Sequence, residues 1–150
     1  MLLFFAALFV TTGGLQATGV LTLVADRIAS VTESNLLLAS VLMLWLAAVL
    51  SAVVDNIPFT IAMLPVIEQL GQLGVETVPL WWALALGAGF GGNGTPIGST
   101  ANVITVSLSE KTRTRITTRV WLRSGLPVML ITCLVATVTL VVFFGWMQTP

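Results

Sequence analysis

Histidine is absent from the 150 residues of the chain, and Cys133 is its only cysteine. Because histidine and cysteine supply most zinc ligands in proteins, the usual zinc sites are excluded. A disulfide within the chain is excluded as well, since it needs two cysteines. Without histidine there is no Ser-His or Cys-His pair for nucleophilic catalysis, so the composition argues against an enzyme. We interpret Cys133, which lies in an apolar run, as a packing residue.

Charge is also scarce. Only 8% of the residues are charged, whereas 57% are hydrophobic, and the mean hydropathy is +1.04. A soluble domain carries about a quarter charged residues, so this composition predicts an all-α polytopic membrane protein whose partner is the lipid bilayer. The formal net charge is zero, which gives no reason to expect a nucleic acid as partner.

Residues 1–25 contain no charged side chain. They are long enough for one transmembrane helix, which needs about 20 mainly apolar residues. Gly13-Gly14 interrupts the run, but glycine is common in transmembrane helices. A signal peptide would begin with a positively charged region, which residues 1–17 lack. We therefore predict a transmembrane helix at 1–25.

Residues 34–70 are predicted to form a re-entrant hairpin. The first arm is the uncharged run 34–54, and the second is the apolar piece 59–67, which ends before Glu68 and is too short to cross a membrane. A turn at Asp55-Asn56 joins the arms and returns the chain to the same face. Pro58 suits the first turn of the second arm, and Asp or Asn suits the positions just before a helix.

Residues 78–108 form an apolar segment that a glycine-rich stretch interrupts at residues 89–102. Glycine and proline destabilise a helix interior, so we predict a broken transmembrane helix with half-helices at 78–88 and 101–108. The alternative is a long loop outside the membrane. Unwound backbone inside a membrane is tolerated only where it is buried in protein or lines a cavity, so a broken helix implies a binding site. The glycines of the break are Gly91, Gly92, Gly94 and Gly98.

Residues 126–146 are the clearest transmembrane helix in the sequence. We interpret residues 111–123, which contain five basic residues, as a solvated loop. A basic cluster beside membrane segments tends to stay in the cytoplasm. We therefore expect the C-terminus outside, a hairpin that opens outward, and a location in the bacterial inner (cytoplasmic) membrane. The basic residues are Lys111, Arg113, Arg115, Arg119 and Arg123.

Polar side chains are concentrated at the hairpin tip and at the helix break. Their oxygen atoms suit a hard cation such as sodium, for which Asp55, Thr95, Ser99 and Asn102 are the candidates. The N-termini of the half-helices, at Pro58 and near Ser99, suit an anion. No lysine or arginine belongs to this set, so an anion would need hydroxyls, helix dipoles and a co-bound cation. The candidate substrate- and ion-binding residues are Asp55, Asn56, Thr60, Asn93, Thr95, Ser99 and Asn102.

Asp55 is the only ionisable residue between Glu33 and Glu68. A carboxylate inside a membrane is costly and by default indicates a proton or sodium site. The structural alternative is that Asp55 caps the second arm at the membrane surface. For the asparagine and serine residues of the break, the alternative is that their side chains satisfy backbone groups of the loop.

Two motifs together resemble a known family. Residues 51–60, Ser-Ala-Val-Val-Asp-Asn-Ile-Pro-Phe-Thr, and residues 91–102 are similar to the paired motifs of the ion transporter superfamily. The nearest branch is the citrate/arsenite permease-like family, which includes arsenical pump membrane proteins, the melanosomal P protein and citrate transporter-like proteins. Sodium/proton antiporters of the same superfamily are close alternatives. Pro96 departs from the aliphatic residue that is usual in the family.

The resemblance implies a fold of two inverted repeats, each with a re-entrant hairpin and a broken helix, that moves as an elevator within a homodimer. It implies that Asp55, Asn56, Thr95, Ser99 and Asn102 surround the substrate and the coupling ion. Family members are much longer, and the match lies in their C-terminal repeat. We therefore expect the N-terminal repeat to be absent from this chain and supplied by a longer product or a second subunit.

Three hypotheses remain open. The first is the C-terminal part of an ion-coupled secondary active transporter, a permease for arsenite, citrate or another small oxyanion or carboxylate, without an organic cofactor. The coupling ion would be sodium or a proton, by symport or antiport. The second is a sodium/proton antiporter in which Asp55 exchanges protons for sodium as the cation substrate. The third is a truncated membrane subunit that does not transport.

Overall fold

A computed structural model describes residues 10, 14, 17, 18 and 35–147. The transmembrane helix predicted at 1–25 therefore lies largely outside the described residues. Within the described part of the chain the elements are helices, without a strand. This agrees with the predicted all-α class.

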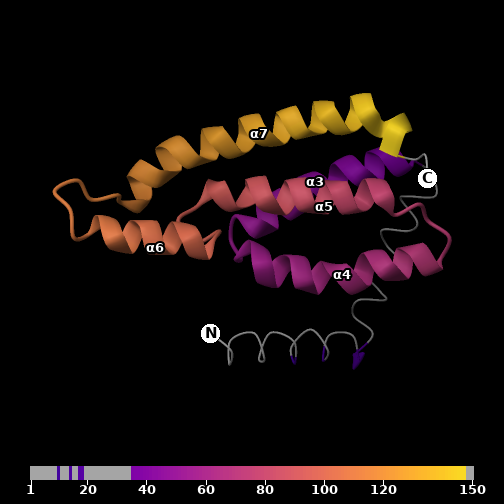
Figure 1. Cartoon of the computed structure of the whole chain (residues 1–150), viewed down its shortest axis with the longest axis horizontal. Coiled ribbons are helices and arrows are strands. Elements are labelled where there is room, and N and C mark those ends of the chain that lie inside the picture. Colours follow the sequence, from indigo (N-terminus) through magenta and orange to yellow (C-terminus); the bar gives the residue numbers. More distant parts are fainter. Residues whose placement is uncertain (1–9, 11–13, 15–16, 19–34, 148–150) are drawn as a thin grey trace.

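Helices α3 (Leu36–Ser51) and α4 (Asn56–Gln72) run in opposite directions and are joined by a short turn (Figure 1). The Asn35 side chain caps α3, because it accepts a hydrogen bond from the Leu38 backbone N–H at 3.0 Å. At 1.5 Å per residue each helix is about 25 Å long, which is less than the roughly 30 Å apolar core of a bilayer. These lengths suit the predicted re-entrant hairpin, and its depth in a membrane stays a prediction.

Helix α4 is longer than the arm predicted at 59–67, and it continues past Glu68 to Gln72. Glu68 is exposed, whereas Ile67 and Leu70 are fully buried. Glu68 therefore lies on the outer side of a continuing helix and does not end it. A charged residue in an apolar run indicates an exposed surface, which can lie along a helix as well as at its end.

Helix α5 (Val78–Gly91) packs along α3 in the same direction, and the two backbones approach closely (Figure 1). A Cβ atom added at Gly87 would collide with the Leu44 carbonyl oxygen, and one at Gly91 would collide with that of Ala48. Because Gly87 and Gly91 are four residues apart, they share one face of α5, as in the small-residue contacts that pack membrane helices. The contact brings the C-terminal ends of α3 and α5 together.

The helix break follows α5. The 3₁₀ turn η1 (Gly92–Gly94) extends α5, residues 95–99 are non-helical, and α6 begins the second half-helix (Thr100–Ser109). The predicted bounds of the half-helices, 78–88 and 101–108, differ from those of α5 and α6 by less than one turn of helix. The break lies beside the turn that joins α3 and α4. The polar residues of the turn and those of the break are therefore in the same region of the molecule (Figure 1).

Helix α7 (Thr118–Met147) has 30 residues and, among the described residues, is the one helix long and apolar enough to cross a membrane. Only 22% of its most apolar window is buried. It begins at Thr118 and not at residue 126, so Arg119 and Arg123 lie on the helix instead of in the predicted loop. Both arginines are exposed. Cys133 is fully buried in the core, as its interpretation as a packing residue requires.

The close contact between α3 and α5 can be tested with two alanine substitutions in α5. We expect Gly91→Ala to lower the free energy of unfolding by about 1–3 kcal/mol, because the added methyl group forces the two backbones apart. Gly89→Ala is the matched control, since a Cβ atom there meets nothing within 4 Å. It should stabilise the helix by about 1 kcal/mol or less. Thermal unfolding in detergent, followed by circular dichroism, measures both. Equal effects of the two substitutions would contradict the packing argument.

Candidate functional site

The hairpin tip consists of the turn between α3 and α4 and the first turn of α4. The turn is closed by hydrogen bonds from the Val53 and Val54 backbone N–H groups to the Leu50 carbonyl, at 3.0 and 2.8 Å. Asp55 is the N-cap of α4, and its Oδ1 atom accepts a hydrogen bond from the Ile57 N–H at 3.1 Å. Pro58 lies in the first turn, where its missing N–H has no intrahelical partner to lose. The capping role that we considered for Asp55 is therefore real.

The helix break is built from extended residues on either side of a tight loop. Thr95 and Ser99 are both extended, with φ of −134° and −154°, and Ser99 caps α6 by accepting a hydrogen bond from the Ala101 N–H at 3.3 Å. Gly98 lies against two other segments. A Cβ atom added there would lie 2.6 Å from the Gly92 carbonyl oxygen and 2.9 Å from that of Ser51. A side chain at position 98 would therefore separate the break from the hairpin.

Two side-chain hydrogen bonds hold the hairpin tip against the break, and a third joins the ends of α3 and α5 beside them. The Ser51 hydroxyl donates to the Ala88 carbonyl at 2.8 Å, and the Thr95 hydroxyl donates to the Ala52 carbonyl. The Thr100 hydroxyl donates to Oδ2 of Asp55. Thr100 is the first residue of α6, so Asp55 connects the N-terminal ends of the two half-helices, α4 and α6 (Figure 1). The predicted convergence of the two polar segments is thus present in the fold.

Side chains satisfy three of the backbone carbonyls that the break frees. The Asn102 side-chain N–H₂ group donates to the Gly92 and Thr95 carbonyls, at 2.8 and 3.1 Å. The Trp121 indole N–H donates to the Asn93 carbonyl at 3.0 Å. For Asn102 this agrees with the structural alternative, in which a polar side chain of the break satisfies backbone groups of the loop, whereas the Asn93 side chain satisfies none. Asn102 keeps only its side-chain oxygen for a ligand, since both of its donors are used.

Asn56 and Thr60 are two candidate site residues whose side-chain polar groups remain free, as do those of Asn93. Their side chains make no hydrogen bond to any residue that the structure describes. Asn56 and Thr60 are four residues apart on one face of α4, and they line a cavity of about 310 Å³ between α4 and α5. The opposite wall is formed by small residues, Ala85, Ala88 and Gly89. This cavity begins at the hairpin tip and offers a ligand an amide and a hydroxyl.

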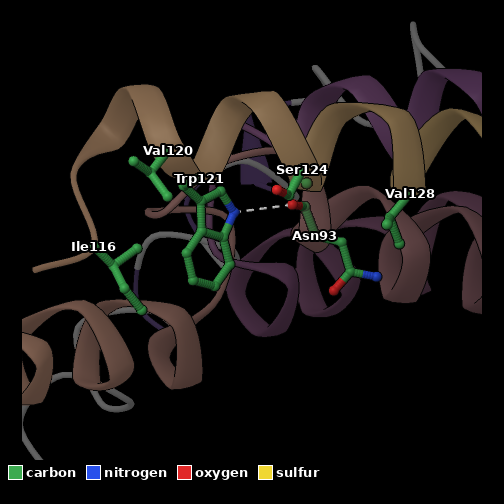
Figure 2. A pocket seen from close by; sticks show the side chains of 7 residues that line it. Asn93, Ile116, Val120, Trp121, Ser124 and Val128 are labelled. Carbon is green, nitrogen blue, oxygen red and sulfur yellow. Dashed lines mark hydrogen bonds between the residues drawn. The ribbon is translucent and has the colours of Figure 1, made fainter. Parts of the chain in front are cut away.

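The Asn93 side chain lies elsewhere. It lines a second cavity, beside α7, and does not line the cavity of Asn56 and Thr60 (Figure 2). Only the Asn93 backbone belongs to the break next to the hairpin tip. Trp121 is a residue of this region that sequence reasoning missed, because nothing in the residues around it indicates a contact with the break.

The set proposed for sodium offers oxygen atoms only. In the described part of the chain there is no group of three or more histidine, cysteine or acidic residues that could hold a metal ion. Asp55, Thr95, Ser99 and Asn102 are all used in hydrogen bonds within the fold. Each side-chain oxygen still has a lone pair, since none accepts more than one of the hydrogen bonds that hold it. Oxygen ligands of this kind are those that a hard cation prefers, whereas transition metals prefer nitrogen and sulfur ligands.

The electrostatics of the site combine one carboxylate with two helix N-termini. The N-terminus of a helix carries a partial positive charge, so the ends of α4 and α6 favour an anion. Asp55 favours a cation at the same place. No lysine or arginine is found among the residues of the hairpin tip, the break or the cavity. Within this part of the chain, the positive groups that face the junction are the backbone N–H groups of the two helix N-termini.

Comparison with known proteins identifies the relatives of this chain. A family model described as "Citrate transporter" matches residues 1–87. An uncharacterized transporter of Synechocystis is 34% identical over 164 residues, which cover 98% of this chain and 36% of that protein. The P protein of Homo sapiens is 38% identical, covering 97% of this chain and 19% of that protein. No solved structure matches.

A "46 kDa membrane protein" of Mycobacterium leprae is also similar, at 37% identity, with 90% of this chain and 32% of that protein covered. The chain thus spans about a third or less of the length of these relatives. The resemblance to the citrate/arsenite permease-like family is confirmed. Because the family model matches more than half of the residues and the relatives match almost all of them, the chain belongs to the citrate transporter family of integral membrane proteins.

Proposed function

We propose that this chain forms part of an ion-coupled secondary transporter for a small oxyanion or carboxylate. The hairpin tip and the helix break would be its half of the transport site, and the rest of the longer protein would supply the other half. The observation that carries the proposal is the Asp55–Thr100 hydrogen bond, which joins the N-terminal ends of α4 and α6 at one carboxylate.

The chemistry of this junction favours coupled transport. The N-termini of α4 and α6 attract an anion, but the Asp55 carboxylate is already there and repels it. A sodium ion or a proton at Asp55 removes that repulsion. The anion would then bind well only together with the cation, which is the requirement for symport. Discontinuous helices with their ends at the substrate are typical of secondary transporters.

The cavity between α4 and α5 suits a small solute. Its volume of about 310 Å³ lies at the low end of small-molecule sites. Asn56 and Thr60 present it with hydrogen-bonding groups that have no partner among the described residues. We propose that they bind the substrate directly, whereas Thr95, Ser99 and Asn102 hold the break and share the coupling ion with Asp55.

Asp55→Asn tests the coupling role in the complete transporter that contains this chain. The substitution keeps the size and the helix cap but removes the charge that would bind a cation. We expect ion-coupled uptake in proteoliposomes to fall by a factor of about ten or more. A loss of about 1.4 kcal/mol in the binding free energy of the cation is enough for that factor. Glu68→Gln, in the same helix and exposed, should leave uptake unchanged.

Uptake that survives Asp55→Asn would reject the ionic role of Asp55. The same vesicles separate symport from the sodium/proton antiport alternative. Symport predicts sodium entry that depends on the substrate, whereas antiport predicts proton movement driven by sodium alone. If the wild-type complete protein moves neither sodium nor protons, the coupling part of the proposal is wrong.

Thr60→Val tests the substrate cavity. The substitution keeps the shape but removes a hydroxyl that no described residue uses, so the fold should tolerate it. We expect the KM for the transported anion to rise about two- to twelvefold, as for one lost hydrogen bond of about 0.5–1.5 kcal/mol. Thr105→Val is the control, because the Thr105 hydroxyl is exposed on α6 and bonds its own helix at the Ala101 carbonyl. An unchanged KM in Thr60→Val would remove this residue from the site.

A further inference from the structure

A second cavity, of about 330 Å³, lies beside the N-terminal part of α7 and away from the Asn56 and Thr60 side chains (Figure 2). We call it the α7 groove. It follows one side of α7 from Val120 to Val128, a distance of roughly 12 Å at the rise of an α-helix. Its lining residues are Asn93, Ile116, Val120, Trp121, Ser124, Gly125 and Val128.

The groove is largely apolar and is built around Trp121. The indole ring is fixed by its hydrogen bond to the Asn93 carbonyl, and Figure 2 shows it between Ile116 and Asn93. A Cβ atom added at Gly125 would collide with that same carbonyl, so η1 can reach α7 only at a glycine. The groove is thus a fixed feature of the contact between α7 and the break. An elongated apolar groove of this kind fits a hydrocarbon chain.

Positively charged residues adjoin one end of the groove in the chain. Ile116, which lines that end, directly follows Arg115, and Arg113 precedes it in the same loop. Both arginines are exposed, and neither has an ion pair with a described residue. Arg119 and Arg123 do not line the groove, and their positions along α7 direct them to its other side. By their positions in the chain, Arg113 and Arg115 are therefore better placed than Arg119 and Arg123 to act on a ligand in the groove.

We propose that the α7 groove binds an anionic phospholipid, with an acyl chain along Trp121 and Val128 and the phosphate beside Arg113 and Arg115. Tryptophan is enriched at membrane interfaces, and basic residues beside a membrane helix attract anionic lipids. A zwitterionic lipid carries no net charge that the arginines would attract. A free anion has no hydrocarbon chain to pack against the apolar wall of the groove. The proposal does not depend on transport, so it stands or falls separately from the proposed function.

Tryptophan fluorescence provides the test. A variant that keeps Trp121 and carries phenylalanine in place of Trp45, Trp81, Trp82 and Trp146 reports on the groove alone. The chain is reconstituted in two matched series of phosphatidylcholine vesicles. One series contains increasing mole fractions of brominated phosphatidylglycerol, and the other contains the same mole fractions of brominated phosphatidylcholine. We expect the anionic lipid to quench Trp121 at clearly lower mole fraction, and the preference to weaken as the salt concentration rises.

Two matched double variants identify the charges. Arg113→Gln with Arg115→Gln should reduce the preference for the anionic lipid roughly tenfold or more. Arg119→Gln with Arg123→Gln removes the same net charge from the other side of α7 and should leave the preference within about twofold. Ser124→Phe, which fills the groove from an exposed position, should abolish the preference while the helix content stays unchanged.

Equal quenching by the two lipids would overturn the proposal, because the groove would then hold ordinary bilayer lipid. Equal loss of preference in the two arginine pairs would also overturn it, since the attraction would be that of net charge alone. Quenching by neither lipid would mean that protein covers the groove, as a second copy of the chain would. That result too would overturn the proposal.

Discussion

The arrangement of the site depends on one carboxylate. Asp55 accepts a hydrogen bond from the N–H of Ile57 with one oxygen and from the hydroxyl of Thr100 with the other. The first bond starts α4, and the second holds the start of α6 against it. If the carboxylate were absent, the Thr95–Ala52 hydrogen bond would be the one left between the hairpin tip and the break among the described residues. The position of the two helix N-termini, and hence any anion site between them, follows from Asp55.

An interrupted helix in a membrane needs partners for its free backbone groups, because hydrocarbon offers none. Asn102 and Trp121 supply them here, for the carbonyls of Gly92, Thr95 and Asn93. Each carbonyl left without a partner would cost on the order of 1–3 kcal/mol. The break is therefore a specific structure and not a loosely coiled stretch. One of these partners, Trp121, belongs to α7, so α7 also takes part in positioning the site.

Much of this could be predicted from the sequence, because glycine, proline and capping residues act locally. Such local rules account for the break within residues 89–102, for the caps at Asp55 and Ser99 and for the small residues of α5. The continuation of α4 beyond Glu68 and the start of α7 at Thr118 could not be predicted, since an exposed charge is equally compatible with a loop and with a helix side. The Trp121–Asn93 bond joins residues 28 apart, and no local pattern indicates it. Nor could it be predicted from the sequence that the Asn93 side chain lines the α7 groove instead of the cavity of Asn56 and Thr60.

The double use of Asp55 also bears on how a transporter of this design would couple its ligands. A carboxylate that caps one half-helix and binds the other occupies the place where two helix dipoles would hold an anion. Protonation or sodium binding would neutralise it without moving either helix, since both hydrogen bonds can persist beside a bound cation. The anion would then meet two positive helix ends and no opposing charge. Coupling would thus arise from electrostatics at a fixed junction, and a conformational change would be needed only to carry the loaded site across the membrane.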